Sequence, residues 1–472
     1  MRRILCMISR PRLMAPVLWM LLNASLVAAA TPSELSGAFR LPRKNGWTFV
    51  HLEGTPHKIG FQNGYLLAPE VDDMLKVVTL EAGHDYNKPW SFFRDAAQNM
   101  MWPHIEQEYR EELQGIADGA AAHGVKIDVW DVIALNAATE WSYYNTQYNK
   151  EHGVQAVALP VPEHCSAFVA TGSYTRDGKV VIAHNNWSTY LEGERWTIIF
   201  DIVPSHGYRV LMDGLPGFIH SADDFVINAR GMAITETTIG HFFGFDPAGI
   251  PEFVRARKAA QYSASIDDFT RIMKDGNNGG YANTWLLADT NKNEIGRLEL
   301  GLKNVTLART TDGYFVGSNF PISGKLIREE TDFDARDLTQ SSAARHVRWE
   351  QLMAENKGKI DVSSAERFLA DHYDVVEKRD DPDERTLDGH VDLSPRGYKG
   401  WVDPYGAVGA VQNKAADASM IARMTFSAAA GHACGKDFKA REHLSAHPEY
   451  DWQKSLERDM DAHPWTSFSI AK

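Results

Sequence analysis

The sequence predicts an α+β protein in which β-sheets are covered by helices. Between residues 57 and 144, apolar residues recur at helical spacing through most of the chain. From residue 165 onward, short runs rich in Val, Ile, Thr and aromatic residues indicate strands. Helical stretches near 251–274 and 341–374 separate or follow these strands, an order that is typical of stacked layers.

The part of the chain before residue 165 is predicted to be mainly helical. After an irregular lead-in, "WTFVHLEG" at 47–54 indicates one strand. Helical patterns follow at 57–83, 90–105, 106–124 and 129–144. A connector at 149–164 contains Gly and Pro and has little periodicity, so it separates this part from the strands that follow.

The part after residue 165 is predicted to be rich in strands. "CSAFVATG" and "KVVIAHNNW" flank the turn signal Arg176-Asp177-Gly178, which indicates a hairpin. Further strands are expected at 196–203, 208–214, 225–229, 231–239, 284–290, 294–301, 305–310 and 313–319. Helices are expected at 251–274, 341–358 and 363–374.

Composition and charge narrow the class of protein. The chain has 472 residues, 44% hydrophobic and 24% charged, with a formal net charge of -13. An acidic chain without a basic stripe is not expected to bind nucleic acid. Residues 1–30 combine a basic start with an apolar run that ends in small residues, as in a secretory signal. A secreted or periplasmic protein is therefore expected, with an uncleaved anchor helix as the alternative and no stable membrane insertion later in the chain.

Cysteine is rare in this chain. Cys6 would leave with the signal, and Cys165 and Cys434 would remain in an oxidising compartment. They could form one bridge, or each could be free. Cys434 near His432 is expected to be a packed or bridged thiol, because Cys and His two residues apart without a second pair are a poor zinc signal. No metal site is therefore expected.

Cys165 follows a connector and begins a strand in "PEHCSAF", which raises the question of a nucleophile. If the bond between His164 and Cys165 were cut, the thiol would lie beside a free α-amino group. That amine has an ordinary pKa of about 7.7–8.0 and could accept the thiol proton. The cut could use the same thiol, attacking the His164 carbonyl. The alternative is a structural cysteine.

Several longer segments favour the nucleophile. "CSAFVATGSYTRDGKVVIAHNNWSTY", "DGLPGFIHSADDFVINARGMAITETTIG" and "NGGYANTWLLAD" resemble the phospholipase B-like proteins, a family of N-terminal-nucleophile (Ntn) hydrolases. "EGTPHKIGFQNGYLLA" is similar to a segment of the acyl-CoA:6-aminopenicillanate acyltransferases. The resemblance implies a four-layer αββα Ntn sandwich at 165–472. It also implies that the helical pro-segment at 31–164 stays bound as a separate chain.

The resemblance also implies site residues. Cys165 matches the family nucleophile, and "AHNNW" would bring His184, Asn185 and Trp187 beside it. Asn283 in "YANTW" matches an asparagine expected to donate to the oxyanion. His184 could instead be a strand histidine that bonds the backbone, Asn185 a turn residue that closes a strand, and Asn283 the cap of a loop. Trp187 is expected to contact the substrate as a wall of the pocket or, alternatively, to be a core aromatic residue.

Two acidic residues near these motifs have alternative interpretations. Asp223 in "SADDF" is expected to contact the substrate or, alternatively, to be a cap. Glu236 in "ITETTI" is expected on the solvated face of a strand.

The chain departs from the family pattern at three places. His184 and Trp187 stand in a region where the wider superfamily often has arginine and aspartate. Ala282 replaces a second asparagine in "YANTW", and Gln412 stands where an aspartate is expected before Lys414. These differences bear on substrate preference more than on the chemistry of cleavage.

The resemblance implies hydrolysis of an acyl ester or non-peptide amide, such as lipid deacylation, through an S-acyl enzyme on Cys165. No cofactor is expected, because the chain supplies nucleophile and base. The expected partners are a small-molecule or lipid acyl substrate and the cleaved pro-segment. An N-acyl amidase or acyltransferase is one alternative. A non-catalytic secreted lipid-binding protein on an Ntn scaffold is the alternative of another class.

Overall fold

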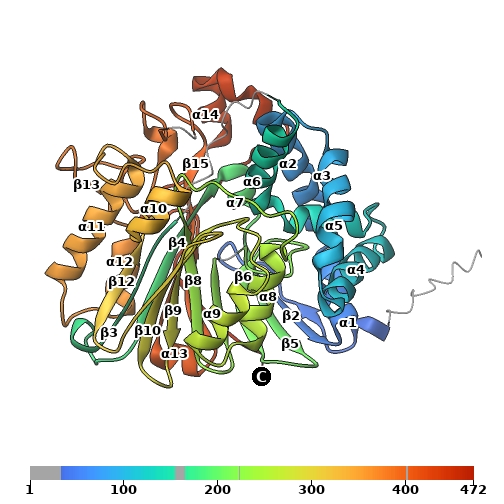
Figure 1. Cartoon of the computed structure of the whole chain (residues 1–472), viewed down its shortest axis with the longest axis horizontal. Helices are drawn as coiled ribbons and strands as arrows, with labels where there is room; N and C mark the ends of the chain where they lie inside the picture. Colours follow the sequence, from blue (N-terminus) through green and yellow to red (C-terminus); the bar gives the residue numbers. More distant parts are fainter. Residues whose placement is uncertain (1–32, 155–164, 223, 400–401, 472) are drawn as a thin grey trace, which may run out of the picture. The chain divides into compact units, whose positions relative to one another are not determined.

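The computed structural model describes residues 33–154, 165–222, 224–399 and 402–471 (Figure 1). Glu34–Lys472 form one compact unit. The signal predicted at residues 1–30 lies outside the described residues. Within the described part, none of the helices combines the length and the apolar character needed to cross a membrane.

The larger sheet has nine strands in the order β1-β2-β5-β6-β7-β8-β9-β10-β11. Neighbouring strands are antiparallel, except that β2 and β5 are parallel. The strands are β1 (Phe39–Arg40), β2 (Thr48–Gly54), β5 (Ile198–Pro204), β6 (Val210–Gly214), β7 (Phe225–Asn228), β8 (Met232–Thr238), β9 (Asn283–Asp289), β10 (Glu294–Leu300) and β11 (Val305–Thr310).

The smaller sheet has six antiparallel strands in the order β12-β3-β4-β15-β16-β17. The hairpin predicted around Arg176-Asp177-Gly178 is present as the pair β3 and β4. The strands are β3 (Ser166–Thr171), β4 (Val181–Thr189), β12 (Gly313–Gly317), β15 (Val408–Asp417), β16 (Thr425–Ala430) and β17 (Thr466–Ser469). β13 (Tyr373–Asp374) and β14 (Arg379–Asp380) form a separate two-stranded ribbon.

The helices fall into groups before, between and after the strands. The α-helices are α1 (Pro56–Leu66), α2 (Ala68–Tyr86), α3 (Trp90–Ala96), α4 (Gln107–Ala122), α5 (Val129–Asn136), α6 (Trp141–Glu151), α7 (Tyr190–Gly193), α8 (Glu252–Tyr262), α9 (Ile266–Lys274), α10 (Gly324–Glu330), α11 (Ser341–Glu355), α12 (Val362–Leu369), α13 (Ala418–Ala422) and α14 (Ala440–Ala446). Short 3-10 helices are η1 (Ser33–Leu35), η3 (Trp102–His104), η4 (Ala138–Glu140), η5 (Gly172–Tyr174), η6 (Val391–Leu393) and η7 (Pro448–Gln453), and η2 (Ala97–Met101) is a π-helix.

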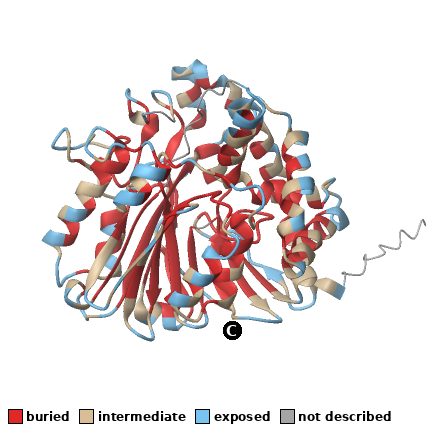
Figure 2. Ribbon diagram, viewed as in Figure 1, coloured by how far each residue is buried: buried red, intermediate tan, exposed pale blue. Residues whose placement is uncertain are grey.

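The two sheets pack face to face and helices cover their outer faces. Ile182 of β4 and Leu286 of β9 belong to the apolar layer between the sheets. Phe269 of α9 packs on the outer face of the nine-stranded sheet, together with side chains of α8. Phe368 of α12 packs on the outer face of the six-stranded sheet, together with side chains of α11. This is the expected four-layer αββα arrangement, and inner strands such as β3 and β8 are buried along their whole length (Figure 2).

The helical stretch predicted at 251–274 is two helices, α8 and α9. The chain leaves helical geometry at Ser263, and Ser265 is extended and starts the next helix. The Ser265 hydroxyl accepts a hydrogen bond from the Asp268 backbone N–H, which satisfies one of the free donors at the start of α9. A serine cap therefore divides one periodic pattern into two elements.

The segment before residue 165 is not entirely helical. Its strand β2, predicted at 47–54, lies inside the larger sheet and pairs with β5 from Thr48 to Gly54. β1 extends that sheet on the other side of β2. Helices α3, α4 and α5 pack together through a shared apolar cluster that includes Phe93 and Ile116. The segment thus contributes both a helical group and two strands to the same compact unit.

Candidate active site

Cys165 lies immediately before β3 and is only 2% exposed. Its φ angle is +90°, a conformation that residues other than glycine rarely adopt. Its carbonyl oxygen accepts a hydrogen bond from Arg345 Nη1 at 2.5 Å. The backbone at the thiol is therefore held in a strained conformation by a side chain from α11, and strain of this kind is concentrated at functional sites.

The alternation of side chains along β4 decides which residues meet the thiol. Ile182 faces the space between the sheets and Ala183 faces the outer helices, so His184 and Asn186 share the inner face. The Cys165 thiol lies 3.5 Å from Asn186 Oδ1, which can accept its hydrogen bond. Asn186 Nδ2 is buried and has no hydrogen-bond partner among the described residues. The Cys165 thiol therefore lies next to the Asn186 side-chain amide, whose Nδ2 donor has no hydrogen-bond partner among the described residues.

Asn185 lies on the other face of β4, although the sequence predicted it beside the nucleophile. Its Nδ2 donates to Leu369 O at 3.2 Å, toward α12. A register shift in β15 between Ala410 and Gln412 lies opposite Asn186 and the residue after it. Because neighbouring residues of a strand face opposite sides, the order of the two asparagines in "AHNNW" could not show which of them faces the thiol.

Trp187 connects the thiol with the outer layer. Its backbone N–H donates to the Cys165 thiol, while its indole Nε1 donates to Leu387 O at 3.2 Å. The guanidinium carbon of Arg345 lies 4.4 Å from the centre of the indole ring. Trp187 also lines the pocket described below.

Arg345 was not singled out in the sequence and is fully buried. Besides Cys165 O, Nη1 donates to Ser166 Oγ at 3.0 Å. Nη2 donates to Asn319 Oδ1 at 2.8 Å and to the Tyr398 hydroxyl at 3.1 Å. The Arg345 side chain therefore joins the start of β3 to two other parts of the chain, at Asn319 and Tyr398. The sequence of α11 shows an arginine at a helical position but not what its side chain contacts. The contact of Arg345 with Cys165 therefore could be found only from the tertiary structure.

His184 belongs to an ionic cluster between the sheets. Its Nδ1 contacts Asp224 Oδ1, and Lys414 Nζ contacts Asp224 Oδ2 and lies 3.1 Å from Asp213 Oδ2. Gln412, which replaces the expected aspartate, contacts Lys414 Nζ through its side-chain oxygen. Burial and the charge of Lys414 lower the pKa of His184 well below its ordinary value, so the imidazole is neutral.

Burial raises the pKa of the Cys165 thiol well above its ordinary value, and the charges of Glu236 and Asp224 raise it further. The Cys165 thiol is therefore protonated at neutral pH. Glu236 is 1% exposed, contrary to the expectation of a solvated strand residue. Both carboxylates line the same pocket as the thiol.

Asn283 begins β9 and is fully buried. With its amide oriented to suit its neighbours, Nδ2 donates to Glu236 Oε2 at 2.8 Å and to Ala282 O at 3.1 Å. The Tyr281 hydroxyl donates to Glu236 Oε1 at 3.3 Å. Asn283 therefore reaches the thiol's surroundings through Glu236 and does not line the pocket itself.

A pocket with an empty volume of about 970 Å³, part of it open to solvent, reaches Cys165. One wall comes from the segment before residue 165, through α2, η4 and α6. The other walls come from β4, α7 and the loops around the larger sheet. The aromatic residues along it are Tyr86, Trp141, Trp187, Trp196, Phe218 and Tyr281. The pocket therefore exists only while both parts of the chain are together.

Two carboxyl groups meet at the wall of this pocket. Glu81 of α2 accepts a hydrogen bond from Thr189 Oγ1 at 2.6 Å, and Glu192 of α7 accepts one from Ser188 Oγ at 3.0 Å. Burial raises the pKa of Glu81 well above its ordinary value, and the charge of Glu192 raises it further. The two side chains also hydrogen-bond each other, so Glu81 carries the proton that they share.

Two predicted site residues and the pairing of the two cysteines remain to be described. His164 and Asp223 lie outside the described residues. Cys165 and Cys434 are both free thiols in this structure.

The residues 86–466 match the model of the Phospholipase B family. An uncharacterized protein of Archaeoglobus fulgidus is 26% identical over 252 residues, which cover 50% of this chain and 40% of that protein. Putative phospholipase B-like 2 of Bos taurus is 29% identical over 26% of this chain and 24% of its own length. Putative phospholipase B-like 1 of Caenorhabditis elegans is 23% identical over 52% and 49%. The matched parts span less than half of each of these relatives.

Among solved structures, a mutant of the conjugated bile acid hydrolase from Clostridium perfringens aligns with 56% of this chain and 88% of its own. The TM-score is 0.33 and the sequence identity is 9%.

Proposed function

Because this chain belongs to the phospholipase B family, we propose that it is a hydrolase that cleaves an acyl ester or non-peptide amide with Cys165 as its nucleophile. The observation that carries the proposal is the position of Cys165. Its thiol lies at the solvent-open pocket described above, beside the amide donor of Asn186 that has no partner among the described residues, and at a strained backbone position.

The first step of the proposal is a cut between His164 and Cys165. The thiol attacks the His164 carbonyl carbon, the peptide C–N bond breaks, and the amine takes a proton. Water then hydrolyses the thioester, which releases the His164 carboxylate and a free α-amine at Cys165. The positive φ of Cys165 supports this step, because breaking the bond would relieve backbone strain.

The second step uses the amine that the cut would free. Before the cut, burial keeps the thiol protonated. After it, the α-amine of the same residue accepts the thiol proton as sulfur attacks the acyl carbonyl carbon of the substrate. The ammonium then gives this proton to the departing amine or alcohol as the C–N or C–O bond breaks. Water attacks the resulting S-acyl enzyme and releases the acid.

We assign the oxyanion donor to Asn186. Its Oδ1 is 3.5 Å from the thiol and its Nδ2 has no other partner in the described part of the chain. A preorganised donor of this kind stabilises the charge that develops on the acyl oxygen. Asn283, expected in this role from the family, is engaged by Glu236 and is proposed to hold that carboxylate in position.

The pocket supports an acyl substrate with a polar end. Aromatic rings supply apolar contact, while Glu81, Glu192 and Asp85 provide acidic groups at its wall. Acyl transfer to an amine instead of water is the nearest alternative. A lipid-binding protein without catalysis is the alternative of another class. The secreted or periplasmic location expected from residues 1–30 is proposed on the sequence alone.

Intact-mass analysis of purified protein tests the proposal together with a substrate panel. The active chain should yield a fragment starting at Cys165, and Cys165→Ala should remain one chain. Lysophospholipids, N-acyl amino acids and simple acyl esters, each with and without an added amine acceptor, would then distinguish lipase, amidase and acyltransferase. An uncut wild-type chain that binds lipid without turnover would favour the binding protein.

A further inference from the structure

A cluster of metal-binding side chains lies behind Trp187, outside the proposed catalytic pocket. His372 follows α12, Asp388 and His390 belong to the long loop between β14 and η6, and Cys434 follows β16. These four residues come from three separate stretches of the chain. Sequence spacing therefore could not reveal them, and His432 with Cys434 alone was a poor zinc signal.

The four ligand atoms are close enough to share one ion, since all lie within 4.8 Å of one another. His372 Nε2 is 3.4 Å from Asp388 Oδ2, and His390 Nε2 is 3.9 Å from the same oxygen. Cys434 Sγ is 3.7 Å from His390 Nε2. With metal bonds of about 2.0–2.3 Å, a tetrahedral zinc ion separates its ligand atoms by about 3.3–3.6 Å. Small side-chain adjustments would therefore complete the geometry.

Two imidazole nitrogens converge at the centre of this cluster. His372 Nε2 is buried, faces Asp388, and makes no hydrogen bond with the described residues. His390 is 1% exposed in its side chain, and its Nε2 has only the Cys434 sulfur at hydrogen-bonding range. Both ring nitrogens thus face the space between the four side chains, with a carboxylate oxygen 3.4 Å from His372 Nε2 and a sulfur 3.7 Å from His390 Nε2, which is the arrangement a shared ion would use.

The surroundings of Asp388 resemble the support that metal ligands receive in proteins. The Cys434 backbone N–H donates to Asp388 Oδ2 at 2.9 Å, and His432 Nδ1 lies 3.2 Å from Asp388 Oδ1. His432 Nε2 is in turn 3.1 Å from the Tyr190 hydroxyl. Hydrogen bonds of this kind orient a ligating carboxylate. Cys434 is exposed, which leaves a path for an ion to enter.

We propose that His372, Asp388, His390 and Cys434 bind one divalent transition-metal ion of the zinc type. Two imidazoles, a thiolate and a carboxylate suit zinc and are poor ligands for Mg²⁺ or Ca²⁺. All four positions are supplied by protein atoms, which is typical of structural rather than catalytic zinc. The proposal is independent of the proposed catalysis.

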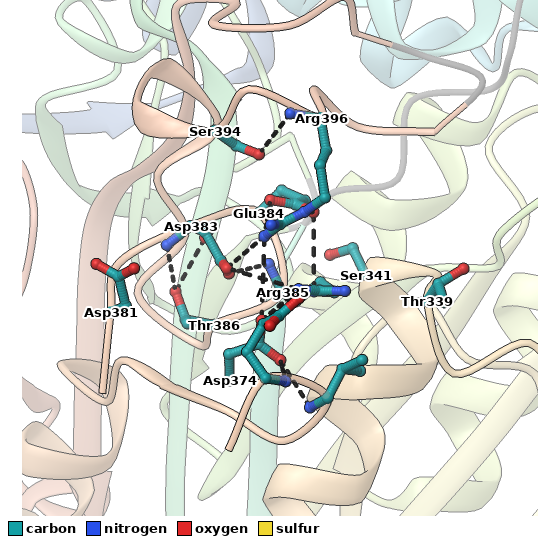
Figure 3. A network of polar contacts seen from close by, with 12 residues as sticks. Thr339, Ser341, Asp374, Asp381, Asp383, Glu384, Arg385, Thr386, Ser394 and Arg396 are labelled. Atoms are coloured by element: carbon teal, nitrogen blue, oxygen red, sulfur yellow. Dashed lines mark hydrogen bonds and ion pairs between the residues drawn. The ribbon is translucent and has the colours of Figure 1, made fainter. Parts of the chain in front are cut away.

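The ion would fasten a loop that supports the pocket wall. Leu387 O accepts the Trp187 indole N–H, and a Cβ added at Gly389 would lie 1.9 Å from the Trp187 ring. Ion pairs fix the adjoining part of this loop, where Arg385 contacts Asp374 and Arg396 contacts Glu384 (Figure 3). The ion would hold the remaining part, from residue 388 to 390, against the end of β16.

Cobalt titration of the metal-free full chain tests the site, because a thiolate bound to tetrahedral Co²⁺ gives a charge-transfer band in the near ultraviolet. We expect the band to saturate at one equivalent in the wild type and in Cys165→Ser, and to be absent in Cys434→Ser. Cys165→Ser is the matched control, because it removes the other described thiol. A wild type without the band, or an undiminished band in Cys434→Ser, would overturn the proposal.

Competition of Zn²⁺ with a chromophoric chelator gives a second readout. His390→Gln should weaken zinc binding by more than about 100-fold, since loss of a mere supporting partner costs about 10–100-fold. His123→Gln, at an exposed histidine after α4, should bind like the wild type. Circular dichroism would establish that each variant is folded. If folded His390→Gln kept wild-type affinity, the assignment would be wrong. If it failed to fold, the Cys434→Ser result would decide.

Discussion

Asn186 Oδ1 lies 3.5 Å from Cys165 Sγ, on the face of β4 that looks between the two sheets. The adjacent Asn185 points the opposite way and bonds Leu369 O. Two neighbouring asparagines therefore offer a direct test of the proposed site, since they share a residue type and a strand but only one of them meets the thiol.

Asn186→Ala should lower turnover by about 10²–10³-fold, because one preorganised oxyanion donor is lost. Asn185→Ala should change turnover only a few-fold, although it removes the bond to Leu369 O. Steady-state kinetics on both variants, with circular dichroism as a folding control, make the comparison. Equal losses in the two variants would contradict the assignment of Asn186.

Arg345→Lys should slow the cut before Cys165 and lower the unfolding midpoint. The guanidinium of Arg345 is planar and has several N–H donors, whereas lysine has a single ammonium group. Lysine at this position therefore cannot donate to Cys165 O, Asn319 and Tyr398 at the same time. Arg348→Lys, one turn along α11 and paired with Asp371, is the control. Gel analysis of fragment appearance after synthesis measures the rate. Cleavage at the wild-type rate in Arg345→Lys would show that this side chain does not hold the cut site.

After cleavage, the two chains should stay together under native conditions. β2 of the first chain pairs with β5 of the second from Thr48 to Gly54, and α2 forms part of the shared pocket. Size-exclusion chromatography should give one peak that contains both fragments, which separate only in denaturant. Two native peaks would contradict the integrated sheet.

The shared proton of Glu81 and Glu192 predicts a loss of stability with rising pH. Both pKa values are raised by burial in the folded state, so this contribution is fully present below pH about 4.5 and is lost as pH rises through the folded values. Each pKa unit corresponds to about 1.4 kcal/mol.

Glu81→Gln should reduce this loss, because its amide can donate to Glu192 without a proton being taken up. Denaturant unfolding of wild type and variant at pH 5 and pH 8 measures the effect. An unchanged pH dependence in Glu81→Gln would show that the pair does not share a proton.

Much of the fold could be predicted from local patterns. The strand at 47–54, the hairpin around Arg176-Asp177-Gly178 and the run of strands from 196 to 319 correspond to observed elements. These segments have a clear alternation of apolar and polar residues or contain turn residues, so their secondary structure can be predicted from the local sequence. β15, β16 and β17 were not assigned as strands. Their sequences are rich in alanine, serine and glycine, whose strand propensity is weak, and they depend on pairing with β4.

The site was less predictable than the fold. Cys165 stood out because a rare residue followed a connector, but Arg345 and Glu236 reach it only through tertiary packing. The choice between Asn185 and Asn186 depended on the side-chain alternation of β4 relative to the sheets. The cluster of His372, Asp388, His390 and Cys434 depended on an irregular loop meeting the end of β16, which periodicity cannot show.

We propose that Cys165 becomes the first residue of a chain and acts through its own amine. N-terminal sequencing and intact mass of the purified active protein measure whether this happens, with Cys165→Ala as the control. We expect a fragment that begins at Cys165 in the wild type, and an uncut, inactive Cys165→Ala chain. A wild type that turns over substrate with the bond between residues 164 and 165 intact would contradict it.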